Sequence, residues 1–144
     1  MNLGHDNLSG NQGDLASLSS RIKAWGRELG FDEVGVSDTD LARAEAGLTA
    51  WLEAGCHGQM DYMYKHGTKR SRPAELLPGT LRVISVRMCY LPDAADALAV
   101  LGDPSKAYVS RYALGRDYHK VLRRRLQKLA ERIVEAVPSA YRVF

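Results

Sequence analysis

Residues 81–90 (LRVISVRMCY) constrain the fold of this chain more than any other segment, because they are rich in β-branched side chains and apolar on both faces. Ile84, Val86 and Met88 point to one side of an extended chain, and Leu81 and Val83 point to the other. A strand that is apolar on both faces is typical of the interior of a sheet. The sequence therefore predicts a central strand in a sheet that is covered on both sides.

Three amphipathic helices are predicted around this strand, because apolar residues recur at spacings of three and four. Each has a capping residue before it and a glycine or proline after it. They are expected at residues 14–29 (cap Asp14, stop Gly30), 40–54 (cap Asp38 or Thr39, stop Gly55) and 118–137 (cap Asp117, stop Pro138).

The remaining segments predict shorter elements. The stretches 31–37 and 141–144 are expected as extended or strand-like, as is 107–112, while 58–66 and the ADALAVL patch suggest single helical turns. Prolines and glycines make residues 69–79 extended or turn-like. Residues 1–13 are polar and predict a disordered lead-in. The alternation of helices and strands indicates an α/β or α+β domain over residues 14–144.

Charge is unevenly distributed along the chain. The net charge is only +3, yet residues 108–144 hold nine basic and three acidic side chains. Such a basic segment is typical of a surface that binds a polyanion, with nucleic acid the first candidate. An ordinary solvated helix face would have the same composition, and the sequence leaves both interpretations open for residues 123–132.

The densest group of functional side chains lies in residues 109–126 (VSRYALGRDYHKVLRRRL). Gly115 allows the backbone to approach a ligand, and the first N–H groups of the following helix could meet an anionic or amide-rich ligand. A simpler interpretation is that Asp117 is only a helix cap and His119 an exposed first-turn residue.

A second group of basic residues, Lys69, Arg70 and Arg72, precedes Pro73 in the turn-like segment. The planar guanidinium of arginine suits carboxylate, amide or phosphate groups on a large cofactor. A solubilising loop would account for the same residues.

Several kinds of site and location are disfavoured. Cys56 and Cys89 are far apart and form no C-x-x-C pair, so they predict neither a disulfide framework nor a zinc or iron–sulfur ligand set. The spacing of Cys56, His57 and His66 fits no metal site. There is no P-loop or dinucleotide fingerprint, no signal peptide and no membrane-length apolar stretch. We therefore expect a cytoplasmic domain with no metal of its own and no membrane contact.

Four segments, taken in order, resemble the epoxyqueuosine reductase family. They are LGFDEVGVSD, HGQMDYMYKH, KRSRPAELLPGTLRVISVRMCYLP and VSRYALGRDYHKVLRRRLQKLAERI. The resemblance extends over residues 15–144, and the combination of RPAELLPG with SRYALGRDYHK makes it specific.

The resemblance implies a nitroreductase-like α+β core with a sheet flanked by helices, similar to cobalamin-dependent reductive dehalogenases and a cobalamin-processing chaperone. It implies two-electron reduction of the epoxide on the wobble nucleotide of tRNA, the final step of queuosine synthesis. Cobalamin is the implied cofactor, with two 4Fe–4S clusters in a later ferredoxin-like domain as its electron source. The implied enzyme is a monomer whose partner is tRNA.

Site residues follow from the resemblance position by position. Arg70 and Ser110 match positions that contact cobalamin, and Arg111, Tyr112 and Asp117 are implied neighbours of the corrin or the tRNA. The proton-donating aspartate of the family is expected just past Phe144, so no catalytic residue is expected in this chain. The cluster-binding and C-terminal repeat domains are absent as well, and we expect an N-terminal cobalamin-binding part that is inactive alone.

Two alternatives are weighed against this interpretation. The basic C-terminal segment equally permits a stand-alone RNA-binding module without catalysis. A flavin-dependent reductase on the related scaffold is less favoured, because no flavin-specific motif is present.

Overall fold

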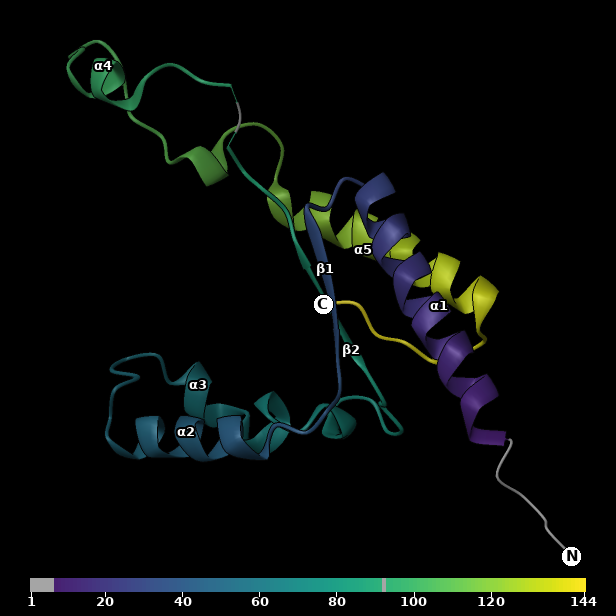
Figure 1. The fold of residues 1–144 in the computed structure, drawn as a ribbon. Helices are drawn as coiled ribbons and strands as arrows, with labels where there is room; N and C mark the ends of the chain where they lie inside the picture. Colours follow the sequence, from purple (N-terminus) through teal and green to yellow (C-terminus); the bar gives the residue numbers. More distant parts are fainter. Residues whose placement is uncertain (1–6, 92) are drawn as a thin grey trace, which may run out of the picture. The chain divides into compact units, whose positions relative to one another are not determined.

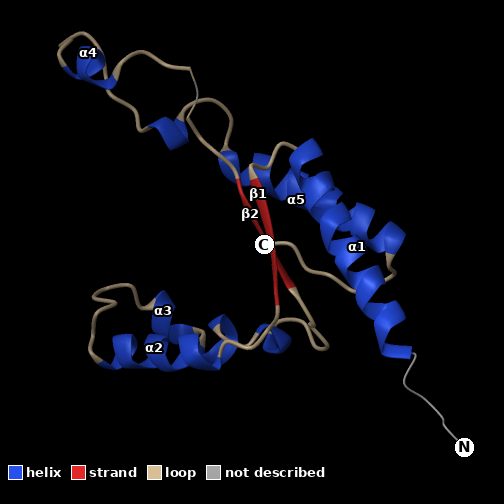
Figure 2. Cartoon of the chain, in the orientation of Figure 1, coloured by secondary structure: helices blue, strands red, loops and turns tan. Residues whose placement is uncertain are grey.

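The computed structural model describes residues 7–91 and 93–144, which form helices, short helical turns and one pair of strands (Figure 2). The chain divides into two compact units: unit 1 comprises Met1–Val34 and Val86–Phe144, and unit 2 comprises Gly35–Ser85. The elements in chain order are α1 (Asn7–Glu28), β1 (Glu33–Ser37), α2 (Ala42–Glu53), α3 (Tyr62–Lys65), η1 (Gly67–Arg70), η2 (Pro73–Glu75), β2 (Val83–Arg87), α4 (Ala97–Leu101), η3 (Arg111–Ala113) and α5 (Tyr118–Ala136).

Unit 1 is built around its two long helices, α1 and α5, which lie side by side (Figure 1). Three apolar side chains are buried among residues 14–91 and 93–144, and all belong to this unit: Ile22 of α1, Phe31 after α1 and Leu129 of α5, of which Leu129 is fully buried. Full burial of a side chain of this size contributes about 1.5–3 kcal/mol. Three such residues make a small core, so hydrogen bonds and close backbone packing must contribute much of the stability of unit 1.

Two close approaches hold α1 to the rest of unit 1. Gly26 lies so tightly against Val34 of β1 that a Cβ at position 26 would collide with the valine side chain. Arg125 of α5 donates from Nη1 to the carbonyl of Gly30 at 2.9 Å, and the same atom lies 3.0 Å from the sulfur of Met88. Gly30 has a φ of +82°, in the left-handed region that favours glycine, and it follows the end of α1 as predicted.

The two helices differ in how well their starts were predicted. For α5 the prediction is confirmed, because Oδ1 of Asp117 accepts the N–H of His119 at 3.0 Å and the helix ends before Pro138. For α1 it is wrong, because the helix begins at Asn7 and Asp14 lies inside it. Each residue added to an existing helix gains one backbone hydrogen bond, so a polar segment can extend it. Of the expected disordered lead-in, residues 7–13 are helical and residues 1–6 lie outside the described residues.

β1 and β2 pair along their length in a two-stranded sheet. The N–H of Asp32 donates to the carbonyl of Arg87 at 2.9 Å, and the Ser37 hydroxyl donates to the carbonyl of Val83 at 3.4 Å, so the strands are antiparallel. The predicted central position of β2 is wrong within the described residues, where it has one neighbour. Apolar side chains on both faces indicate that the faces are covered, and they do not specify how many strands pair at the edges.

Unit 2 contains α2 and a run of short helical turns. The predicted cap of α2 is wrong: Leu41 occupies the N-cap position, and Oδ1 of Asp40 accepts the N–H of Ala42 at 3.2 Å. Asp38 instead accepts the N–H of Asp40 at 3.1 Å, which turns the chain one step before the helix. The stop is confirmed, because Gly55 has a φ of +69°. The short turn expected within 58–66 is α3, and the proline-rich segment forms η1 and η2.

The chain between β2 and α5 is mostly irregular. The predicted helical turn is α4, where Oδ1 of Asp96 accepts the N–H of Ala99 at 2.9 Å. The stretch predicted as extended at 107–112 is irregular only to residue 110, because η3 follows. Residues 141–144 form no strand. The described residues therefore give an α+β fold with a small sheet, and no helix among them is both long and apolar enough to cross a membrane.

Candidate functional site

In unit 2 the basic loop at residues 67–76 is attached to α2 through a single carboxylate, that of Glu45. Arg72 forms a two-pronged contact with it, from Nε to Oε2 at 3.0 Å and from Nη2 to Oε1 at 2.7 Å. The hydroxyl of Ser71 donates to Oε2 at 2.6 Å. Ser71 is 7% exposed and is the one buried polar residue among those whose burial is described, 14–91 and 93–144. Charge-assisted, bidentate contacts of this kind fix geometry as well as adding energy.

These contacts keep Glu45 ionised. Hydrogen bonding from Arg72, and then from Ser71, lowers the pKa of Glu45 from 4.5 to about 2. The opposing effect of desolvation is smaller. At neutral pH the carboxylate is therefore charged and available to both donors.

The loop is also closed on itself. The Thr68 hydroxyl lies 2.8 and 2.9 Å from the two carboxylate oxygens of Glu75, and Arg72 reaches the same carboxylate at 3.8 Å. The backbone N–H of Arg72 donates to the carbonyl of Thr68 at 2.9 Å. The result is a short, cross-linked loop with η1 at one side and η2 at the other.

Arg70 is the residue of this loop whose guanidinium faces solvent with most of its donors free of protein contacts. It is exposed, at the end of η1, and its Nη2 donates to the carbonyl of Tyr62 at 3.0 Å. Its guanidinium carbon lies 5.7 Å from the centre of the Tyr62 ring. A guanidinium has five N–H donors, so a single backbone hydrogen bond orients the group and leaves most donors for a ligand. Arg72, two residues later, instead gives its Nε and Nη2 groups to Glu45.

A depression of about 310 Å³ lies beside the Glu45 contact. Its walls are the residues before α2 and the start of η2: Thr39, Asp40, Leu41, Ala42, Glu45, Ser71, Arg72, Pro73 and Ala74. Arg70 is not among them, so this hollow does not extend the surface that Arg70 presents.

In unit 1 the other predicted site residues fall on one short stretch between η3 and α5. Ser110 is exposed and precedes η3 without a side-chain capping bond. Arg111 is half-buried, whereas Tyr112 is 54% exposed with its ring edge-on to Tyr118, 5.9 Å between ring centres. Gly115 has a φ of +81°, which allows the turn that separates this group from α5.

Asp117 is held by the helix it caps. Besides accepting the N–H of His119, its Oδ1 lies 3.1 Å from Nδ1 of the same histidine, whose ring stacks on Tyr118. Desolvation acts to raise the pKa of Asp117, but hydrogen bonds and charge from His119 and the charge of Lys120 outweigh it and hold the pKa below its ordinary value. The simpler interpretation of this aspartate and histidine, as cap and first-turn residue, accounts for their contacts.

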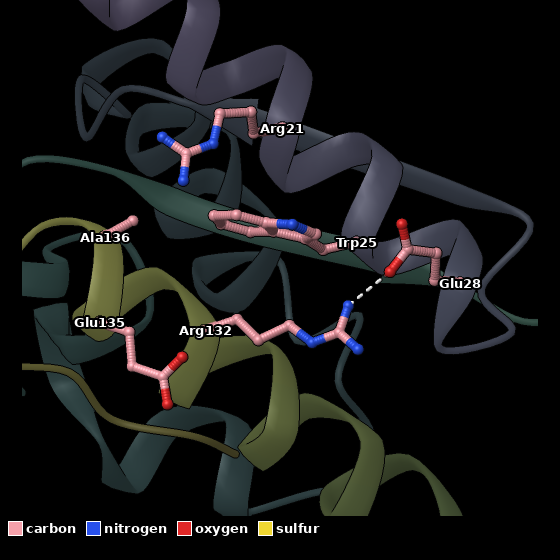
Figure 3. A pocket seen from close by; sticks show the side chains of 6 residues that line it. All are labelled: Arg21, Trp25, Glu28, Arg132, Glu135 and Ala136. Atoms are coloured by element: carbon pink, nitrogen blue, oxygen red, sulfur yellow. Dashed lines mark hydrogen bonds and ion pairs between the residues drawn. The ribbon is translucent and has the colours of Figure 1, made fainter.

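A second depression, of about 400 Å³, lies between α1 and α5 in unit 1 (Figure 3). Arg132 spans it to Glu28 at 2.6 Å, and the guanidinium of Arg21 lies 4.8 Å above the ring of Trp25. Glu135 and Ala136 complete the lining. The basic and acidic groups are paired or mixed, so this hollow favours no one class of charged ligand.

The structure thus groups Ser110, Arg111, Tyr112 and Asp117 in unit 1 and places Arg70 in unit 2. Sequence reasoning missed Glu45, although a signal was present. Glu45 stands four residues after Leu41 and three before Leu48, within the apolar stripe of α2, where a carboxylate needs a partner. Cys56 and Cys89 are free and exposed, and no group of three metal-ligating side chains occurs in the part of the chain that is described.

Comparison with known proteins was made at two levels, a family model and individual curated relatives. Residues 70–144, just over half of the chain, match the family described as "Epoxyqueuosine reductase QueG, DUF1730". Among curated relatives, the epoxyqueuosine reductase of Pseudomonas aeruginosa is 64% identical over 140 residues, covering 96% of this chain and 38% of the relative.

Two further relatives give the same picture. The epoxyqueuosine reductase of Burkholderia pseudomallei is 61% identical, covering 90% of this chain and 36% of its own length. That of Escherichia coli K12 is 61% identical, with 83% and 32% covered. The chain therefore spans about a third of the length of these relatives. No solved structure matches it. The family match over residues 70–144 and the identity to these relatives show that the chain belongs to the epoxyqueuosine reductase family.

Proposed function

We propose that this chain is the N-terminal, cobalamin-binding part of an enzyme that reduces epoxyqueuosine to queuosine at the wobble position of tRNA. The observation that carries the proposal is the identity of 64% over 140 residues to an epoxyqueuosine reductase. The same match favours a part of a reductase over a stand-alone RNA-binding module. The finer features belong to the proposal as well: a nitroreductase-like core, a cytoplasmic location and a monomeric enzyme.

The donor set of the chain suits cobalamin, which carries amide groups and a phosphate. The Arg70 guanidinium is exposed and oriented, and the loop behind it is fixed to α2 through Glu45. The Ser110 hydroxyl is exposed and makes no capping bond. In the proposed enzyme Arg70 would bind amide or phosphate oxygens and Ser110 would accept or donate one hydrogen bond. Arg111, Tyr112 and Asp117 would form the surroundings of the corrin or the tRNA.

The chemistry divides between this chain and other parts of the proposed enzyme. Cobalamin, when bound, supplies the two-electron reduction of the epoxide. Each of the two proposed 4Fe–4S clusters needs four thiolates, and this chain has two cysteines, so the cluster ligands belong to the ferredoxin-like domain. The proposed proton donor lies outside the chain. The task of these 144 residues is then to bind and orient the cofactor, and we expect no turnover from them alone.

Titration of the chain with cobalamin, followed by the shift of its visible absorption bands, tests the proposal. The matched pair is Arg70→Ala and Lys69→Ala, because Lys69 is a neighbouring exposed cation on η1. Hydrogen bonds to a charged group contribute about 1.5–3 kcal/mol, so Arg70→Ala should raise the Kd roughly 10- to 100-fold. Lys69→Ala should leave the Kd within about twofold of that of the unsubstituted chain.

Equal dissociation constants for the two variants would remove Arg70 from the cofactor site. Absence of any spectral shift, together with a yellow protein as purified, would replace cobalamin with flavin.

A further inference from the structure

We propose that the solvent-facing side of the first three turns of α5, formed by Lys120, Arg123, Arg124 and Lys128 and called here the α5 basic face, binds the phosphate backbone of RNA. The proposal rests on the proposed function, in which the substrate is a tRNA, and it assigns a surface to that substrate.

The structure divides the basic residues of α5 into two groups with different tasks. Arg125 and Arg132 serve the fold of unit 1, the first through the Gly30 carbonyl and Met88, the second through Glu28. Arg123, Arg124 and Lys128 are exposed and make no hydrogen bond or ion pair with any residue that the structure describes. Packing and internal pairing therefore account for two of these arginines and leave the exposed ones unexplained.

Helix geometry places the exposed cations together. At 100° per residue, Lys120, Arg124 and Lys128 are successive members of one row, about 6 Å apart along the axis, and Arg123 lies beside them. This arc is opposite Leu129, the residue of α5 that is buried. The α5 basic face is thus a continuous strip of four positive side chains directed to solvent.

The order of charges along α5 works against the stability of the helix itself. A helix is stabilised by acidic residues near its start and basic residues near its end. In α5 Lys120 stands in the first turn and Glu135 in the last, the reverse of that order, which only Asp117 at the N-cap follows. Like charges spaced four apart, as in the row from Lys120 to Lys128, also repel. A role in binding a polyanion explains an arrangement that folding alone disfavours.

The composition of the face selects the kind of contact. Between Lys120 and Glu131 the same arc also includes Gln127 and holds no aromatic or aliphatic side chain; its first apolar member is the half-buried Val134, beyond the four cations. Without aromatic rings it cannot stack bases, and without apolar side chains it lacks the means by which a helix inserts into a lipid surface. Of the contacts considered, the face is suited only to phosphate groups, which position an RNA but do not read its sequence.

The test measures RNA binding by fluorescence anisotropy, using the full chain and a labelled anticodon stem-loop at several KCl concentrations. The test variant is Arg123→Gln/Arg124→Gln. The matched control is Lys23→Gln/Arg27→Gln, which removes two exposed cations from α1, in the same unit. Each lost phosphate contact lowers the slope of log K against log salt by about 0.7–0.9. The test variant should lose between one and two from that slope and bind on the order of 10- to 100-fold more weakly at 0.1 M salt. The control should change neither quantity beyond the general effect of net charge.

Restoring charge should restore binding, so Arg123→Lys/Arg124→Lys should keep the salt slope of the unsubstituted chain, while circular dichroism confirms that the helix is intact. Equal losses in both glutamine variants, or no salt-dependent binding by the chain at all, would overturn the proposal. Binding to phosphatidylserine vesicles that depends on Arg123 and Arg124, without such dependence for RNA, would overturn it in favour of a membrane. Cobalamin binding is measured in a separate experiment, with the Arg70 variant. If only the RNA-binding proposal for the α5 basic face failed, the proposed function would therefore still stand.

Discussion

The loop at residues 67–76 and the segment at residues 90–114 both carry proposed cofactor contacts, yet they are held in opposite ways. The loop is tied to α2 by side-chain contacts that join residues 26 and 27 positions apart. In the segment, the side-chain hydrogen bonds among described residues join positions only two or three apart, as between Asp103 and Ser105.

The two regions also differ in what they expose. The loop buries Ser71 and turns charged groups outward. The segment exposes a run of large apolar side chains: Tyr90, Leu91, Leu98, Leu101, Tyr108, Val109, Tyr112 and Leu114. Because these side chains are exposed, they add little buried apolar area to fix the segment in place. Arg70, by contrast, is fixed by side-chain contacts within unit 2, through the loop and Glu45. No comparable contact between distant residues holds Ser110 among the described residues of unit 1.

The largest effect should come from the core of unit 1. Leu129→Ala removes a side chain that is 1% exposed, and it should lower the free energy of unfolding by about 2–5 kcal/mol, because a cavity adds to the lost burial. Leu101→Ala is the control in the exposed segment, at 63% exposure, and should change it by no more than about 0.5 kcal/mol. Urea unfolding measures both. A loss at Leu101 as large as that at Leu129 would mean that the segment packs in solution.

A smaller effect should follow acidification of the loop. Because the pKa of Glu45 is lowered from 4.5 to about 2 on folding, its contribution is complete above pH 4.5 and is lost as the pH falls through about 2. The hydrogen-exchange protection of the Arg72 amide, which donates to Thr68, should therefore fall several-fold over that window. Glu45→Gln should lack this decline and have weak protection throughout, while Glu53→Gln on the same helix should behave like the unsubstituted chain. A decline that persists in Glu45→Gln would place the titrating group elsewhere.

The smallest effect is expected where two charges meet in solvent. Arg132 and Glu28 are 2.6 Å apart, but their side chains are 40% and 60% exposed. Exposed pairs contribute roughly 0.2–1 kcal/mol, so Glu28→Gln should shift the urea midpoint slightly, and 0.5 M salt should remove the difference. A shift as large as that of Leu129→Ala would show that the groove between α1 and α5 is drier than its exposure indicates.

Sequence predicted best those features that depend on local chemistry. The apolar period of three and four located α2 and α5, Asp117 caps α5, and Gly30 and Gly55 end their helices because glycine adopts positive φ without strain. The cap of α2 was misplaced by two or three residues, since Leu41 occupies the N-cap position. Before it, Asp38 and Asp40 each accept the backbone N–H two residues later and so form two successive turns.

Features that depend on distant parts of the chain were predicted less well. The sequence of β2 shows that both of its faces are apolar. Which strands pair with its edges depends on other segments of the chain, so its position in the sheet could not be predicted from its own residues. Of the site, Arg70 and Ser110 came from the family resemblance and their roles stay predictions. The contact between Glu45 and the loop depends on α2 returning to a segment 26 residues away, and periodicity carries no such information.

Arg70 and Arg72 are chemically identical and two positions apart, yet only the second is committed to a carboxylate inside the fold. Composition is therefore no guide to which substitutions the RSRP stretch can tolerate. A change at Arg72 leaves the Glu45 carboxylate charged and without its guanidinium partner, so such a change is best tolerated together with a change at position 45. Among the described residues Arg70 has no carboxylate partner of this kind, and its replacement would cost unit 2 one hydrogen bond to the Tyr62 carbonyl. Two neighbouring arginines thus differ in what their loss does to the fold, and only Arg72 leaves a charged partner behind.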